Sequence, residues 1–152
     1  MLAGAASAVL GASAMAGCRP ARSFTPPRYF PSAAAPGRPA PPFSGAVRAG
    51  GLLLLAGQLG TDATGRLVAG GVEAETRQAL ANVRATLERA GTTMDDVVKC
   101  TAMLADVAEL ERMNRAYVAH FRADRLPARS AFGASGLALG ARVELECWAA
   151  VR

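Results

Sequence analysis

The residues that could do chemistry gather in one stretch, which reads LPARSAFGASGLALGARVELE from Leu126 to Glu146. An arginine, Arg129, stands near its start, and two carboxylates, Glu144 and Glu146, stand at its end. An arginine can clamp an anion, and a carboxylate can hold a water molecule or transfer a proton. The small and apolar residues between them predict a β-hairpin with charged ends.

The glutamates alternate with apolar residues, as in a strand that has one buried face. The two alternating sets are Val143, Leu145 and Cys147, and Glu144, Glu146 and Trp148. If the first set faces the helices, both glutamates point to the free face of the sheet. Two interpretations are open. The charges are ordinary surface groups, with Arg129 as an ion-pair partner of little energetic weight, or they form a site.

Few other side chains offer nucleophilic or metal-binding chemistry. The three cysteines, Cys18, Cys100 and Cys147, form no CxxC pair, and the only histidine is His120. A zinc site is therefore not expected. A histidine-dependent nucleophile would have to use His120, which lies in a helical pattern where a surface or partly buried role is expected.

The chain has the size of one domain, since it has 152 residues and 51% of them are hydrophobic. Its formal charge of +5 could indicate a nucleic-acid partner. Five arginines precede the first acid, Asp62, so the 17 basic residues leave twelve beyond that point, equal to the 12 acids. The excess charge lies mainly in an N-terminal tail that fits a membrane surface as well as RNA. We expect no nucleic-acid interface on the folded core.

The first 18 residues resemble a secretion signal, because every residue from Leu2 to Gly17 is either small or apolar. The run from Met15 to Cys18 is similar to the lipobox of bacterial lipoproteins. It implies lipidation of Cys18, anchoring to a membrane and a periplasmic location. No basic residue precedes Arg19. The alternative is a misplaced start with no export, and a cytoplasmic protein.

Residues 19–42 hold eight of the nine prolines. This composition predicts an extended, partly polyproline tether that forms no hydrogen-bonded ladder. The folded domain is expected to span 43–152, starting at Phe43.

Periodicity within the domain predicts the element order βββαβαββ. Strands are expected in GAVRAGG, in LLLLAGQLG, at 65–68, in VVKCTAMLA, from about 130, and from about 142 to 151. The central strand should place one set of side chains on a single face: Val98, Cys100, Ala102 and Leu104.

Two amphipathic helices are expected to cover the same face of this sheet. The first has a stripe of Thr76, Leu80, Val83 and Leu87 and ends near Gly91. The second starts at a capping-box-like pair, Asp106 and Glu109, and has a stripe of Leu110, Met113, Tyr117 and Phe121. The uncovered face with its aliphatic side chains predicts a symmetric oligomer.

Several motifs in this order resemble the Rid (YjgF) family of reactive-intermediate deaminases. The family's signature region is similar to PARSAFGASGLALGARVELE, and the resemblance extends through PFSGAVRAGGLLLLAGQLGTD, TRQALANVRATLERAG, VVKCTAMLAD and MNRAYVAHF. It implies an α+β fold with a six-stranded sheet and two helices on one face, like chorismate mutase of the trimeric type. It also implies a homotrimeric barrel with ligand sites between subunits.

By this resemblance, Arg129 clamps the substrate carboxylate and Glu144 positions the attacking water. Asn114 lies near the arginine, and the main chains of Gly57 and Ala131 line the site. The implied reaction is hydrolysis of a 2-imino acid to a 2-keto acid and ammonia, with no metal or organic cofactor.

Three positions depart from the family pattern and reduce the polarity of the cleft. Ala56 stands where many members carry serine, Ala131 where they carry cysteine, and Phe43, which also lines the site, where they carry tyrosine. We expect carboxylate binding to persist and the substrate preference to shift toward larger or more apolar imino acids.

Two other functions compete with imine hydrolysis. One is a non-catalytic trimeric protein that binds a small carboxylate in the same cleft. The other is RNA cleavage, an activity attached by name to some family members, which the neutral core and the lack of paired histidines do not favour.

Overall fold

The computed structural model describes residues 25–34, 36–37 and 39–151. The signal-like segment, with its lipobox-like run and Cys18, lies outside these residues, as does the first part of the predicted tether. Within the described ranges, no helix is long and apolar enough to cross a membrane.

A single mixed sheet forms one layer of the molecule, in the order β1-β2-β3-β7-β5-β6, with β4 paired to β7 beside this path. All pairings are antiparallel except that of β5 with β6. The strands are β1 (Arg28–Pro31), β2 (Ser44–Ala49), β3 (Leu52–Leu55), β4 (Gln58–Leu59), β5 (Val97–Leu104), β6 (Ala128–Gly133) and β7 (Val143–Ala150).

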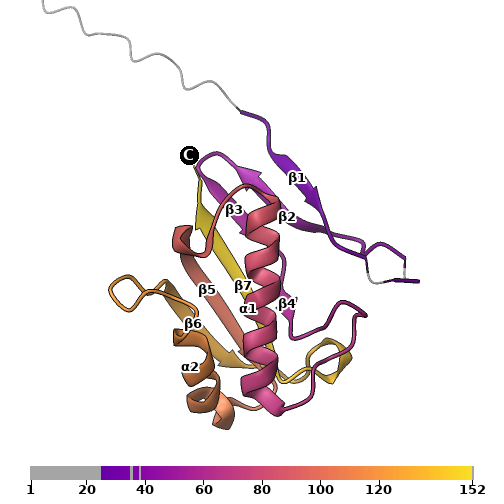
Figure 1. Cartoon of the computed structure of the whole chain (residues 1–152), viewed down its shortest axis with the longest axis vertical. Coiled ribbons are helices and arrows are strands. Elements are labelled where there is room, and N and C mark those ends of the chain that lie inside the picture. Colours follow the sequence, from indigo (N-terminus) through magenta and orange to yellow (C-terminus); the bar gives the residue numbers. More distant parts are fainter. Residues whose placement is uncertain (1–24, 35, 38, 152) are drawn as a thin grey trace, which may run out of the picture.

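Two helices form the second layer and cover one face of the sheet (Figure 1), which confirms the predicted α+β fold. They are α1 (Gly71–Arg89) and α2 (Leu110–Val118); short 3-10 turns occur at Met94–Asp96, Val107–Glu109 and Ala138–Gly140. The predicted stripe of α1 is fully buried, and Met113 and Tyr117 of α2 are buried as well. Gly91, with a φ of +81°, follows the end of α1 as expected.

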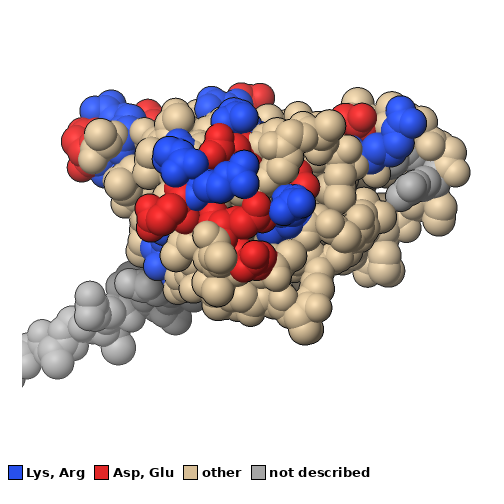
Figure 2. Space-filling model, turned by 90° about the horizontal axis from the view of Figure 1, so that it is seen from below, with Lys and Arg blue, Asp and Glu red and all other residues tan. Residues whose placement is uncertain are grey.

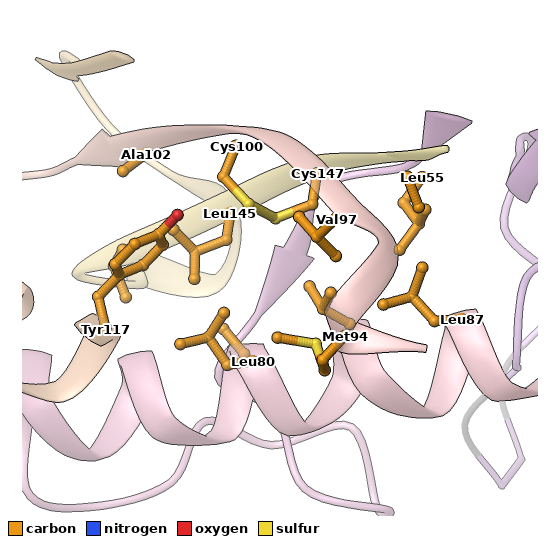
Figure 3. Packing of buried hydrophobic residues seen from close by; sticks show 14 of the residues in the cluster. Leu55, Leu80, Leu87, Met94, Val97, Cys100, Ala102, Tyr117, Leu145 and Cys147 are labelled. Carbon is orange, nitrogen blue, oxygen red and sulfur yellow. A yellow bond between two sulfur atoms is a disulfide. The ribbon is translucent and has the colours of Figure 1, made fainter. Parts of the chain in front are cut away.

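The core lies between the helices and the sheet (Figure 3). Leu80 and Leu87 of α1 pack there against side chains from the sheet. Cys100 of β5 and Cys147 of β7 stand directly opposite each other and form a buried disulfide. The sequence had indicated no pairing for these cysteines, because their proximity depends on which strands become neighbours.

One part of the predicted tether is a strand, so the prediction that residues 19–42 form no ladder is wrong there. Arg28–Pro31 pairs with β2 as β1, and Phe30 packs against the core. A strand at the edge of a sheet tolerates proline, since only some of its N–H groups must donate to a neighbour.

The predicted strand at 65–68 is also wrong. The carboxylate of Asp62 accepts hydrogen bonds from the backbone N–H groups of Thr64 and Arg66, at 2.8 and 3.1 Å, and so forms a turn. Only an isolated bridge between Thr61 and Leu67 remains of the expected pairing.

Two details of the central strand and the second helix differ from expectation. A register irregularity between Val97 and Lys99 buries Val97 and leaves Val98 45% exposed. Asp106 caps its turn by accepting from the Ala108 N–H, but the carboxylate of Glu109 accepts from Arg142 instead of closing a capping box.

The expected hairpin between Arg129 and the glutamates does not form. The strands β6 and β7 lie on opposite sides of β5, one parallel and the other antiparallel to it. The two ends of the signature stretch are therefore separated by a strand that comes earlier in the chain.

Candidate active site

The strand β6 places Arg129 on the side of the sheet that the helices cover. Arg129 pairs with Cys100, which is buried beneath the helices, whereas the adjacent Ser130 lies on the other face and accepts a hydrogen bond from Lys99 at 2.7 Å. The Arg129 guanidinium carbon lies 4.9 Å from the ring centroid of Tyr117 on α2. Among the described residues, no acid forms an ion pair with Arg129. This cation is available for an anion.

Two polar atoms on α2 are buried without a hydrogen-bond partner among the described residues: Oδ1 of Asn114 and the hydroxyl of Tyr117. The amide nitrogen of Asn114 donates only a long hydrogen bond to Glu111, at 3.5 Å. Asn114 lies on α2, the helix whose Tyr117 contacts Arg129, and its carbonyl oxygen is free to accept. Ala131, two residues beyond Arg129, lies on the same side of β6.

Glu144 lies on the opposite face of the sheet, where it pairs with Met103 of β5 and Leu59 of β4. Its apolar neighbours Val143 and Leu145 are fully buried on the helix side, so the predicted alternation is confirmed. Burial of the Glu144 carboxyl, and secondarily the charge of Glu146, raise its pKa above the usual value. A half-buried carboxylate with a raised pKa is suited to accept and return a proton.

The glycine at position 57 brings main chain directly against Glu144. A Cβ atom at Gly57 would collide with a carboxylate oxygen of Glu144 and would lie 2.9 Å from its Cδ. Gly57 and Phe43, which is 58% exposed, both line a cleft of about 500 Å³ that is also lined by Gln78 and Asn82 of α1. The departure at Ala56 lies next to Gly57, and its N–H donates to the Gly45 carbonyl.

The predicted site residues thus fall into two groups that do not meet within one chain. The arginine group consists of Arg129, Ala131 and Asn114, and the glutamate group of Glu144 and Gly57; Phe43 shares a cleft with Gly57. Arg129 and Glu144 are two strands and three residues apart, which separates their Cα atoms by roughly 14 Å, and they point to opposite faces. One small molecule can contact both groups only if a second copy of the chain supplies one of them.

Tyr117 is the residue near the site that sequence reasoning missed. Its predicted place in the apolar stripe of α2 is correct. The stripe indicates a core residue, so it gave no reason to expect a contact with Arg129. Nothing in the helical spacing indicates which strand lies beside the ring.

Charged surface residues at the α2 end of the molecule form a network of ion pairs between two glutamates and three arginines. Its members are Glu73, Glu109, Arg112, Arg115 and Arg142. Figure 2 views this end and shows acidic and basic side chains intermixed on it. Within the described part of the chain, no three His, Cys, Asp or Glu side chains gather as a metal site would require.

The chain is similar to known proteins in both sequence and structure. Residues 33–151 match the endoribonuclease L-PSP family, so the match begins before Phe43. A 2-iminobutanoate/2-iminopropanoate deaminase of Bos taurus is 42% identical over 106 residues, which cover 69% of this chain and 77% of that protein. The protein of the same name from Homo sapiens is 38% identical over 120 residues, with coverages of 78% and 86%.

Solved structures agree with these relatives. YyfA of Yersinia pestis, described as a member of the conserved Rid protein family, has a TM-score of 0.75 and 35% identity and covers 83% of this chain and 100% of its own. The YjgF product of E. coli has a TM-score of 0.71 and 30% identity, with coverages of 82% and 99%. The chain therefore belongs to the endoribonuclease L-PSP family, which includes the Rid and YjgF proteins.

Proposed function

We propose that this protein hydrolyses reactive 2-imino acids to 2-keto acids and ammonia, in clefts between the subunits of a homotrimer. The observation that carries the proposal is the separation of Arg129, a cation without an acid partner among the described residues, from Glu144, a carboxylate with a raised pKa. Relatives named as imine deaminases support the same reaction.

The two groups divide the chemistry between them. Arg129 holds the substrate carboxylate with its planar fork of donors. Glu144 of the neighbouring copy accepts a proton from water as the water oxygen bonds to the imine carbon. The same carboxyl then returns this proton to nitrogen, which gives a carbinolamine. It next takes the proton of the carbinolamine hydroxyl and delivers it to nitrogen as the carbon–nitrogen bond breaks, so ammonia leaves and the carbonyl of the keto acid forms.

The free face of the sheet supports assembly into an oligomer. It carries large apolar side chains that are more than a third exposed, among them Leu52, Phe132 and Trp148. Glu144 lies on this same face, and the ring nitrogen of Trp148 donates to Glu146 at 2.8 Å. Burial of this face between copies would enclose the glutamate group and bring an arginine group to it.

The substitutions in the cleft suggest which imino acids are preferred. Phe43 and Ala131 are exposed and apolar where many relatives have polar side chains, so we expect larger or more apolar substrates to react faster. Equal rates with imines derived from alanine, leucine and arginine would contradict this preference.

The test generates imino acids with an amino-acid oxidase and follows their decay in the presence of wild type and variants. Glu144→Gln should lower kcat by about 10²- to 10⁴-fold. Arg129→Ala should raise KM by about tenfold or more, since a charged hydrogen-bonding partner is lost. Arg125→Ala is the matched control, because Arg125 pairs with Asp95 on the surface and should leave both constants unchanged.

A wild-type protein no faster than buffer would reject the hydrolase proposal. The second candidate, a carboxylate-binding protein without turnover, is favoured by the loss of polar groups at Ala56, Ala131 and Phe43. Binding of pyruvate by such an inactive wild type, lost in Arg129→Ala, would support it.

We also propose export to an oxidising compartment. A disulfide such as Cys100–Cys147 persists mainly outside the cytosol, and it fits the expected lipidation of Cys18 and attachment to a membrane. Mass spectrometry of the native N-terminus tests this, and an intact, unacylated Met1 would contradict it.

A further inference from the structure

We propose that Tyr117 is a positioning residue for Arg129, whose guanidinium it holds over its ring so that the donor fork faces the substrate carboxylate. The inference rests on the proposed function, since it assigns Arg129 the carboxylate. It adds a residue from the buried layer of α2 to the arginine group.

Arg129 needs such a support because little else restrains it. It lies on β6, the last strand at that end of the described sheet, and it forms no ion pair with any described acid. A free arginine side chain samples many rotamers, and ordering it on binding weakens the clamp. The ring of Tyr117, 4.9 Å from the guanidinium carbon, is within the range of a cation–π contact.

The ring itself is held firmly in place. Tyr117 is only 2% exposed, and its ring packs against that of Phe121 with centroids 4.7 Å apart. Figure 3 shows the side chain standing between α2 and the sheet, with the hydroxyl oxygen directed toward the sheet. Because the core fixes the ring of Tyr117, the ring can restrict the position of the Arg129 guanidinium that lies over it.

The aromatic face, and not the hydroxyl, makes the contact. The hydroxyl has no hydrogen-bond partner among the described residues, so it does not hold Arg129 through a hydrogen bond. Burial raises the pKa of Tyr117 to about 12, although the charge of Arg129 opposes the shift, so the phenol stays neutral at working pH. The attraction is therefore between a cation and the ring quadrupole.

A positioning role predicts a specific kinetic pattern. A guanidinium that lies on a ring presents its N–H groups at the edge of the plane, where a carboxylate can accept two of them. Loss of the ring should weaken ground-state and transition-state binding of the carboxylate alike, which raises KM and leaves kcat nearly unchanged.

Two substitutions and a control separate the ring from the hydroxyl and from general packing. Tyr117→Leu removes the ring and should raise KM about tenfold. Tyr117→Phe keeps the ring and should leave KM within about twofold of wild type. Phe121→Leu removes a ring that packs against Tyr117 but keeps the ring beneath Arg129, so it should raise KM less than Tyr117→Leu does.

A wild-type protein that is inactive on imines would refute the proposed function but not this inference. Two further measurements test the inference in that case. Pyruvate affinity should fall in Tyr117→Leu and persist in Tyr117→Phe. In NMR spectra, the Nε–H resonance of Arg129, identified by its loss in Arg129→Ala, should carry an upfield ring-current shift in wild type and Tyr117→Phe.

Three results would overturn the proposal. The first is an Arg129 resonance in wild type at the position of a solvent-exposed arginine, which needs no Tyr117 variant to fold. The second is a Tyr117→Leu protein with wild-type KM and pyruvate affinity. The third is a Tyr117→Phe protein as impaired as Tyr117→Leu, which would assign the effect to the hydroxyl.

Discussion

Loss of the Cys100–Cys147 disulfide should lower the free energy of unfolding by about 4 kcal/mol. The two cysteines are 47 residues apart in sequence, and the chain-entropy relation for a loop of that length gives about this value. Both side chains are fully buried on neighbouring central strands, so the cross-link joins the strand that carries Glu144 to the strand beside Arg129.

Urea unfolding of wild type with and without dithiothreitol measures this contribution. The midpoint should fall when the reductant is present, and a Cys100→Ala/Cys147→Ala protein should be insensitive to it. Cys18→Ala is the matched control, because it removes a thiol that takes no part in the cross-link and should leave the midpoint unchanged.

Thiol counting gives an independent check under denaturing, non-reducing conditions. Two of the three cysteines are cross-linked, so one reactive thiol at most is expected per chain. Three reactive thiols, together with a midpoint that dithiothreitol does not move, would refute the reasoning.

Three further predictions concern the glutamate group and its surroundings. In the proposed reaction Glu144 is a base only when ionised, so activity should fall as the pH drops through its raised pKa. Glu146→Gln should move this acid limb to lower pH, and an unmoved limb in rate–pH profiles would contradict the coupling. Gly57→Ala should lower kcat by about 10²-fold, because its Cβ displaces the Glu144 carboxylate, and retention of wild-type kcat would show that the carboxylate position is unimportant. Gly60→Ala should destabilise the fold by about 1–3 kcal/mol in urea unfolding, since its Cβ would lie 2.5 Å from Glu75 Cα, and an unchanged midpoint would mean that α1 can move away.

Much of the fold follows from periodicity, because burial imposes it locally. The stripe of α1 and the alternation from Val143 to Cys147 indicate which side chains face the core, and both predictions are confirmed. Errors arose where another interaction outweighed the pattern. The carboxylate of Asp62 formed a turn in place of a strand, and Phe30 reached the core from a proline-rich segment.

The site is harder to predict because it depends on which strands are neighbours. Periodicity predicted Glu144 on the free face, but it could not predict Arg129 on the opposite face. The face to which Arg129 points depends on the register in which β6 pairs with β5. The roles proposed for both residues come from the resemblance to a family and not from their spacing. The contact of Tyr117 with Arg129 has no counterpart in sequence spacing, because it joins a helix to a strand through packing alone.

The short strand β1 has a practical consequence for work with this protein. It covers the hydrogen-bonding edge of β2, and its Pro31 lacks the N–H that a further strand would need. A chain shortened to begin at Phe43, where the sequence alone suggests a boundary, would leave that edge open to strands of other molecules. Shortened versions of this protein should therefore retain Arg28 to Pro31. Removing these residues should cause aggregation through the open edge of β2, while the rest of the domain stays folded.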